Sequence, residues 1–148
     1  MQKELFMTSM QIDQVQSTWQ KVMPFREDIA VLFYRRLFEI EPELSMVFKG
    51  DMHDYLKKIM FMIDLAILNL GQLERVMPML QEMANKYVQC GMKVDSNAVR
   101  NTFISILERH LSETFTGDIR SDWIQTYDVL VGVVKDAVTE KVTYGFTD

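Results

Sequence analysis

The chain has 148 residues, a formal net charge of −5 at pH 7 and one cysteine, with 48% hydrophobic and 25% charged residues. Its length fits one globular domain with a sizeable core. The acidic balance argues against a nucleic-acid partner, because a phosphate footprint needs a clustered basic surface. The single cysteine favours a reducing compartment, and the lack of a long apolar run predicts a cytoplasmic domain without a membrane span.

Apolar residues recur at helical spacing along nearly the whole chain, and the sequence contains no strand-period segment of any length. Proline and glycine punctuate this pattern at Pro24, Pro42, Gly71 and Pro78, where we expect helix ends, a helix start or a bend. We predict an all-α fold in a single domain over residues 1–148, with its core over about 9–142. The expected helices cover residues 9–22, 25–40, a short segment from 41, 52–70, 72–89, 96–115 and 118–142.

The stretch from residue 79 to residue 94 organises the chain. Its apolar and aromatic residues are Met79, Leu80, Met83, Tyr87 and Cys90. They are spaced three and four apart, so they share one helical face. The glycine that follows stands where a helix end commonly needs a left-handed residue. The pattern predicts a buried helix that ends near residue 90.

Several stretches resemble the globin family, in particular neuroglobin-like bacterial single-domain haemoglobins. They are LFYRRLFEIEP (32–42), MVFKGDM (46–52), LKKIMFMID (56–64), KYVQCGMK (86–93) and FTGDIRSDW (115–123). Their order and spacing make the likeness specific, and it covers about residues 12–137. The resemblance implies a globin fold of seven to eight helices around a central haem-type pocket.

The resemblance also assigns residues to the two sides of a haem. Tyr34 and Tyr55 fall at distal positions, Phe48 and Ile59 at positions that pack against the macrocycle, and Lys58 near the propionates. Four apart, Tyr55 and Ile59 share a helical face, as such a pocket requires. The remaining residues that the resemblance places at the cofactor site are Met83, Tyr87, Met92, Val99 and Tyr127.

The main departure from the globin pattern is Tyr87, which stands where the family carries the histidine that binds haem iron. Neither His53 nor His110 can replace that histidine, because one lies about 200° round the helix from the distal position and the other lies far from the proximal face. Tyrosinate is a competent haem ligand that favours ferric iron. The sequence therefore predicts Tyr87 as the metal ligand, with Cys90 and Met83, one turn away, as conceivable substitutes.

Two functions follow from the resemblance, and the sequence leaves both open. The first is haem binding with an atypical proximal side, suited to sensing a small gaseous or anionic ligand, or to peroxidase-type or NO-type redox chemistry, more than to reversible oxygen carriage. The second is a haem-free regulatory module that binds a fatty-acid-like molecule or a protein partner, with Tyr34, Tyr55 and Tyr87 filling the pocket. Related sensor globins often pair through their last two helices, so a homodimer is compatible with either function.

Overall fold

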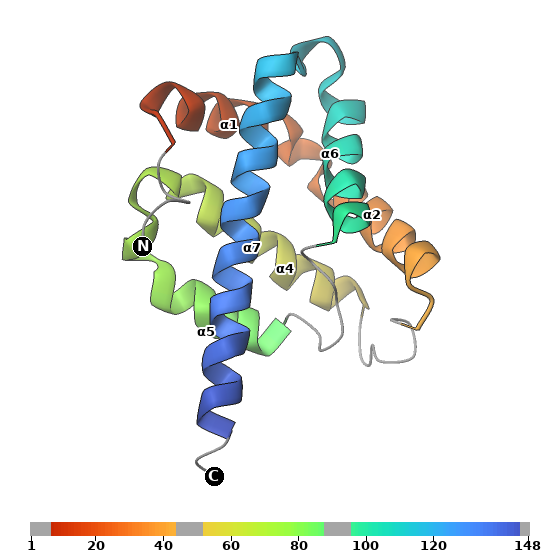
Figure 1. The fold of residues 1–148 in the computed structure, drawn as a ribbon. Coiled ribbons are helices and arrows are strands. Elements are labelled where there is room, and N and C mark those ends of the chain that lie inside the picture. The colour runs from red at the N-terminus through yellow and green to blue at the C-terminus, as the bar shows by residue number, and fades with distance from the viewer. Residues whose placement is uncertain (1–6, 44–51, 88–95, 146–148) are drawn as a thin grey trace.

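The computed structural model describes residues 7–43, 52–87 and 96–145, without the side chains of residues 52, 87 and 138–145, and most of this part of the chain is helical (Figure 1). The all-α prediction is confirmed, although the described residues form six α-helices rather than seven or eight. They are α1 (Ser9–Val22), α2 (Arg26–Ile40), α4 (Met52–Leu68), α5 (Met77–Tyr87), α6 (Asn97–Leu111) and α7 (Gly117–Gly145). Three short 3-10 helices join them: η2 (Met23–Phe25), η3 (Leu70–Arg75) and η4 (Ser112–Thr114).

The first helix begins where local chemistry dictates. The Thr8 hydroxyl accepts a hydrogen bond from the backbone N–H of Gln11 at 3.1 Å, and the Gln11 side chain accepts one from the backbone N–H of Thr8 at 2.8 Å. This reciprocal capping box satisfies two backbone donors that a helix start leaves unpaired. The α1 boundaries therefore match the prediction, and those of α2 match to within one residue.

The predicted boundary between the fourth and fifth helices is wrong. Helix α4 ends at Leu68 rather than near Leu70, and η3 replaces the expected first turn of the next helix. Gln72 has φ −141° and ψ 50°, which breaks the helical path before α5 begins at Met77. Pro78 consequently lies in the first turn of α5, where a missing N–H is harmless, and does not bend the helix.

The predicted end of the sixth helix is also wrong. Helix α6 ends at Leu111 rather than near residue 115, because Ser112 has a φ of 49°. A positive φ is uncommon for a residue with a Cβ, and serine gives no sequence signal for it. The short helix expected from residue 41 falls largely on residues 44–51, outside the described part of the chain.

Two tryptophans anchor the core where α1, α4 and α7 meet. The Trp19 and Trp123 rings lie 5.8 Å apart, and both side chains are at most 1% exposed. The Trp123 indole donates to the Thr18 hydroxyl at 2.8 Å, and the Trp19 indole donates to Asp64 Oδ1 at 2.8 Å. Each buried N–H therefore has an acceptor on another helix, so these bonds fix how α1 sits against α7 and α4.

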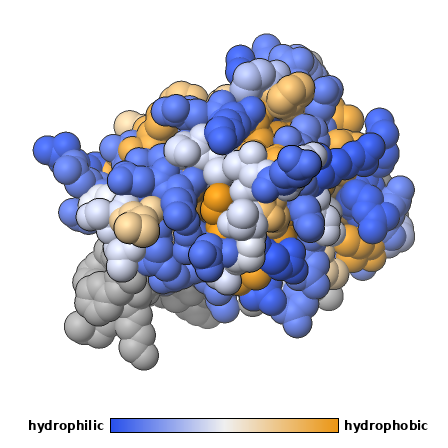
Figure 2. Space-filling view, turned by 90° about the horizontal axis from the view of Figure 1, so that it is seen from above, coloured by the Kyte–Doolittle hydropathy of each residue, from blue (hydrophilic) through white to orange (hydrophobic). Residues whose placement is uncertain are grey.

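The surface of the described residues is mixed rather than uniformly polar. Figure 2 shows one face on which hydrophobic patches alternate with hydrophilic side chains. None of the helices in the described ranges is both long and apolar enough to cross a membrane. The large hydrophobic side chains that are exposed are Met10, Phe25, Val31, Ile40, Phe61, Leu68 and Met79.

Candidate functional site

Helices α2 and α4 bring two of the predicted distal residues together. Tyr34 of α2 is 5% exposed and Tyr55 of α4 is 8% exposed. Their rings meet edge to face, with centroids 5.6 Å apart and planes at 80°. This geometry is the one that aromatic quadrupoles prefer. The pair forms a contact between α2 and α4.

The Tyr34 hydroxyl is held neutral. Burial disfavours the phenolate and raises the pKa of Tyr34 well above its usual value of 10, and the nearby Tyr55 phenol and a hydrogen bond to it raise the pKa further. Tyr34 therefore keeps its proton across the physiological range. A neutral phenol can donate a hydrogen bond as well as accept one.

An apolar wall continues from this pair into the core. Ile59, predicted to pack over the iron, is 8% exposed and shares with Tyr34 a small enclosed void of about 20 Å³. A void of this size has room for about one water molecule. Its lining comes from α2, α4 and α6, and consists of Ile29, Ala30, Phe33, Tyr34, Leu56, Ile59, Met60, Ile63 and Phe103.

Two further predicted residues lie in the aromatic core behind the void. Tyr127 of α7 is 8% exposed and packs on Phe103 with ring centroids 5.5 Å apart, while Phe103 meets Phe33 edge-on at 6.0 Å. Val99 of α6 is 1% exposed. Phe103, which the sequence did not single out, therefore links Tyr127 to the helix that carries Tyr34.

Lys58, predicted near the haem propionates, lies at the surface. Its side chain is 45% exposed, and its ammonium forms an ion pair with Asp54 at 2.9 Å, one helical turn earlier. Exposed pairs of this kind hold a side chain only weakly. Lys58 can therefore exchange its partner for another anion at little cost.

The predicted proximal residues lie on or beyond α5. Leu80 and Ala84 are buried at 1% and 0% exposure and Met83 is half-buried, so this face of α5 packs into the molecule. Tyr87 is the last residue of α5, one turn after Met83, and its side chain is outside the described part of the structure. Phe48 and Met92 lie outside the described residues altogether, as does Cys90.

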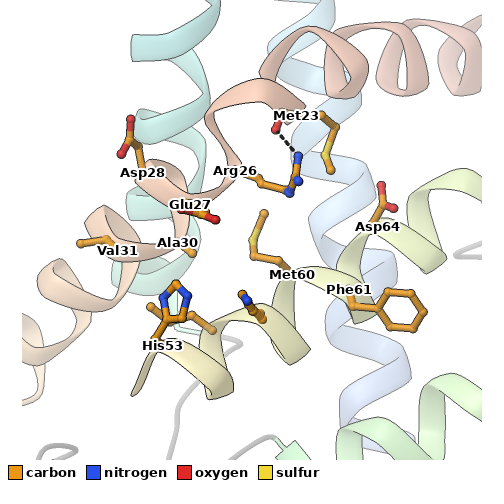
Figure 3. Close-up of a pocket in the computed structure, with 12 residues that line it drawn as sticks. Met23, Arg26, Glu27, Asp28, Ala30, Val31, His53, Met60, Phe61 and Asp64 are labelled. Carbon is orange, nitrogen blue, oxygen red and sulfur yellow. Dashed lines mark hydrogen bonds between the residues drawn. The ribbon is translucent and has the colours of Figure 1, made fainter. Parts of the chain in front are cut away.

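The sequence missed a larger groove between α2 and α4, next to the void beside Tyr34. Its volume is about 500 Å³, and His53 lies on its edge (Figure 3). The sequence signal for this groove was weak: charged residues stand near the apolar Val31 and Phe61. Both apolar side chains are exposed in the structure. No group of three or more histidine, cysteine or acidic residues that could hold a metal ion occurs among the described residues.

Comparison with known proteins gives relatives that are consistent with this arrangement. The chain is 25% identical to neuroglobin of Dissostichus mawsoni, over 81% of this chain and 85% of that protein. It is 26% identical to neuroglobin of Tetraodon nigroviridis, over 79% of this chain and 83% of that protein. A solved structure, the closed form of the globin domain of HGbRL, aligns with 27% identity and a TM-score of 0.39, over 90% of this chain and 99% of that chain.

The family model of the globins matches residues 31–134. This range contains α4, α5 and α6 together with most of α2 and of α7, and it includes every residue predicted for the cofactor site. The chain therefore belongs to the globin family.

Proposed function

We propose that this globin binds haem between α4 and α5, with Tyr34 and Tyr55 on the distal side and Tyr87 as the iron ligand. The observation that carries the proposal is the buried, neutral phenol of Tyr34, which lies against Tyr55 on the α2–α4 wall of a globin. Each buried hydroxyl needs a hydrogen-bonding partner, and Tyr34 has one in Tyr55, a phenol whose place a bound ligand can take. A ligand-binding wall has a use for both.

The described residues fit a haem in their chemistry. Tyr55 and Ile59 present aromatic and aliphatic surface one turn apart on α4, which suits burial of an apolar macrocycle. Lys58 adjoins them at the exposed edge, where a cation can meet carboxylates that remain in water. On α5, the half-buried Met83 and the position of Tyr87 follow the same buried face as Leu80.

Tyr87 determines which chemistry the site favours. A phenol has an ordinary pKa near 10 and must lose its proton to bind a metal well, which the charge of the metal promotes. Haem iron, when bound, supplies an open coordination position for a small gaseous or anionic ligand, and tyrosinate stabilises its ferric state. We therefore propose sensing of a ferric-haem ligand, or redox chemistry of the peroxidase or NO type, rather than reversible oxygen carriage.

The distal tyrosines orient and protect what reaches that position. Tyr34 is held protonated, so its hydroxyl can donate a hydrogen bond to a bound anion without first taking up a proton. The Tyr55 ring packs against Tyr34 and keeps water from the wall. In moving its hydrogen bond from Tyr55 to a ligand, Tyr34 exchanges one partner for another rather than losing one.

The test is a haemin titration of the purified protein followed by visible spectroscopy. We expect a saturable one-to-one complex with a ferric–phenolate charge-transfer band. Tyr87→Phe should abolish the band, whereas Tyr144→Phe, near the end of α7, should leave it unchanged. A folded protein that takes up no haemin, or a band that survives in Tyr87→Phe, would contradict the proposal.

One observation favours the second function. Tyr34 and Tyr55 already pack ring against ring, and the void beside them has room for only about one water molecule. A haem-free globin module that takes a fatty-acid-like molecule or a protein partner would keep this packing. Tyr87→His separates the two functions: if the variant binds haemin reversibly with a histidine-ligated spectrum, the site lacks only its ligand, and if it does not, the second function is favoured.

A further inference from the structure

The groove between α2 and α4 adjoins the void beside Tyr34 and shares Ala30, Leu56 and Met60 with it. Tyr55 and Ile59, the α4 residues proposed to face haem, do not line it, whereas Leu56, Lys57, Met60 and Phe61 of the same helix do. At about 500 Å³ the groove falls within the size range of small-molecule sites. An inference about it therefore does not rest on haem binding.

The groove has an apolar floor and apolar rims. Ala30 and Leu56 are buried at 5% and 6% exposure, and Met60 is half-buried beside them. Val31 and Phe61 stand at its edges with 41% and 58% of their surface exposed. A ligand that covered these exposed apolar side chains would remove their surface from water, which favours binding.

Charges of both signs stand above this floor. Figure 3 shows Arg26 and Glu27 extending from the start of α2 toward Met60 of α4. The Arg26 guanidinium donates to the Met23 carbonyl at 3.1 Å, which holds it at that end of the groove. Lys57 lines the opposite wall. The ion pairs found among the described residues involve none of Arg26, Glu27 or Lys57.

Asp64, at the far end, has its own partner. It accepts the Trp19 indole N–H at 2.8 Å, so at least one of its oxygens belongs to the scaffold. Glu27 makes a dianionic ligand such as a phosphate ester unfavourable, because its carboxylate extends toward Met60 (Figure 3). The groove therefore favours a ligand that carries one negative charge and one positive charge together with an apolar group.

We propose that this groove binds a small apolar zwitterion of the amino-acid or short-peptide class. The ligand carboxylate would pair with Arg26 and Lys57, its ammonium with Glu27, and its apolar side groups would cover Met60. Guanidinium and carboxylate form charge-assisted hydrogen bonds, which give orientation, while the apolar floor supplies most of the binding energy. The arrangement gives Arg26, Glu27 and Lys57 each an oppositely charged partner on the ligand.

The first experiment is a titration of the ¹⁵N-labelled full chain with the dipeptide leucyl-phenylalanine, followed by backbone amide shifts, before and after haemin is added. The titration should extend to about 10 mM, ten times a dissociation constant of 1 mM. We expect saturable shifts confined to residues 26–31 and 53–64 in both states. Shifts that never saturate, or that saturate elsewhere on the chain, would overturn the proposal.

Variants then test the role of each charge. Arg26→Gln and Lys57→Gln should each weaken the dipeptide about fivefold, the most that one exposed charge contact supplies. The matched control is Lys58→Gln, which removes a neighbouring cation that does not line the groove. Equal weakening by Lys58→Gln, or none by the two groove variants, would mean that net charge and not this groove determines binding.

A ligand without its positive charge completes the test. The N-acetylated dipeptide should bind the wild type about fivefold more weakly than the free dipeptide, for the same reason. In Glu27→Gln the two ligands should bind equally, because the carboxylate that distinguishes them is gone. If Glu27→Gln retains the preference for the free dipeptide, the assignment of the ammonium to Glu27 is wrong. None of these outcomes depends on whether the haemin titration succeeds.

Discussion

Two buried aromatic pairs, one of tryptophans and one of tyrosines, differ in where their polar atoms go. The Trp19–Trp123 pair has ring centroids 5.8 Å apart, and both indole N–H groups donate to acceptors on other helices, Asp64 and Thr18. The Tyr34–Tyr55 pair is as close, at 5.6 Å, but there the Tyr34 hydroxyl is hydrogen-bonded to a second phenol. The tryptophan bonds fix helix positions, whereas a phenol partner can rotate and exchange.

This comparison separates scaffold from site. An indole N–H donates only, so a buried one that loses its acceptor is left unsatisfied. A phenol donates and accepts, so a tyrosine pair can admit a third polar group without leaving a donor unpaired. We therefore expect substitutions in the tryptophan pair to lower the stability of the fold, and substitutions in the tyrosine pair to change mainly the affinity for a ligand.

The largest effect should come from the tryptophan pair. Trp123→Ala removes a side chain with 0% exposure from the centre of the core, and should lower the free energy of unfolding by about 3–5 kcal/mol. Denaturant unfolding followed by circular dichroism measures this change. Met10→Ala, at a side chain that is 71% exposed, is the control and should change stability little. A small loss in Trp123→Ala would mean that the pair does not anchor the fold.

The acceptor of the Trp19 indole should come next. Asp64→Ala leaves that N–H without its acceptor and should destabilise the fold by about 1–3 kcal/mol. Asp64→Asn retains a carbonyl oxygen in the same place and should lose less. The difference between the two variants, measured in one denaturant series, isolates the hydrogen bond from the loss of side-chain volume. Equal losses would show that the bond contributes nothing beyond packing.

Sequence patterns predicted the bounds of α1 and α2 but not the ends of α4 and α6. Apolar spacing, together with the proline at residue 24, placed α1 and α2 to within one residue, because those signals are local. The ends of α4 and α6 were not predicted correctly, because Gln72 and Ser112 adopt backbone angles that are not typical of either residue type.

The tyrosine wall could be predicted from the sequence, whereas the groove could not. Helical spacing placed Tyr55 and Ile59 on one face of α4, and family resemblance brought Tyr34 to the same wall. The groove could not be predicted, because its existence depends on the distance between α2 and α4 and on side-chain directions that spacing does not contain. The role of Tyr87 stays a prediction.

Removal of the Tyr34 hydroxyl should have a smaller effect on stability, with a pH dependence that tests its burial. Tyr34→Phe loses one hydrogen bond and should cost about 1 kcal/mol at pH 7. The pKa of Tyr34 is raised in the folded state, so its contribution is fully present below pH 10, the usual tyrosine value. It declines above pH 10, because the unfolded chain then releases a proton that the folded chain retains.

The two proteins should therefore converge in alkali. Above pH 10 the wild type should lose about 1.4 kcal/mol per pH unit relative to Tyr34→Phe, until the folded phenol itself ionises. Denaturant unfolding of both proteins between pH 8 and about pH 11 measures the difference, and the other titrating groups cancel between them. If the difference in unfolding free energy between the two proteins does not depend on pH, water reaches Tyr34. The tyrosine pair would then be less well buried than the tryptophan pair.

The smallest effect should come from the surface pair beside the tyrosines. Asp54→Asn and Lys58→Gln break an ion pair with 58% and 45% exposed side chains, and a double-mutant cycle should give a coupling of at most about 0.5 kcal/mol, decreasing with added salt. If haem binds as proposed, Lys58→Gln should also weaken haemin binding a few-fold while Asp54→Asn should strengthen it slightly, because freeing Lys58 makes its charge available to a propionate. Equal changes in haemin affinity for both variants would mean that Lys58 does not contact the propionates. The tyrosine wall would then bind haem without a cation at its edge.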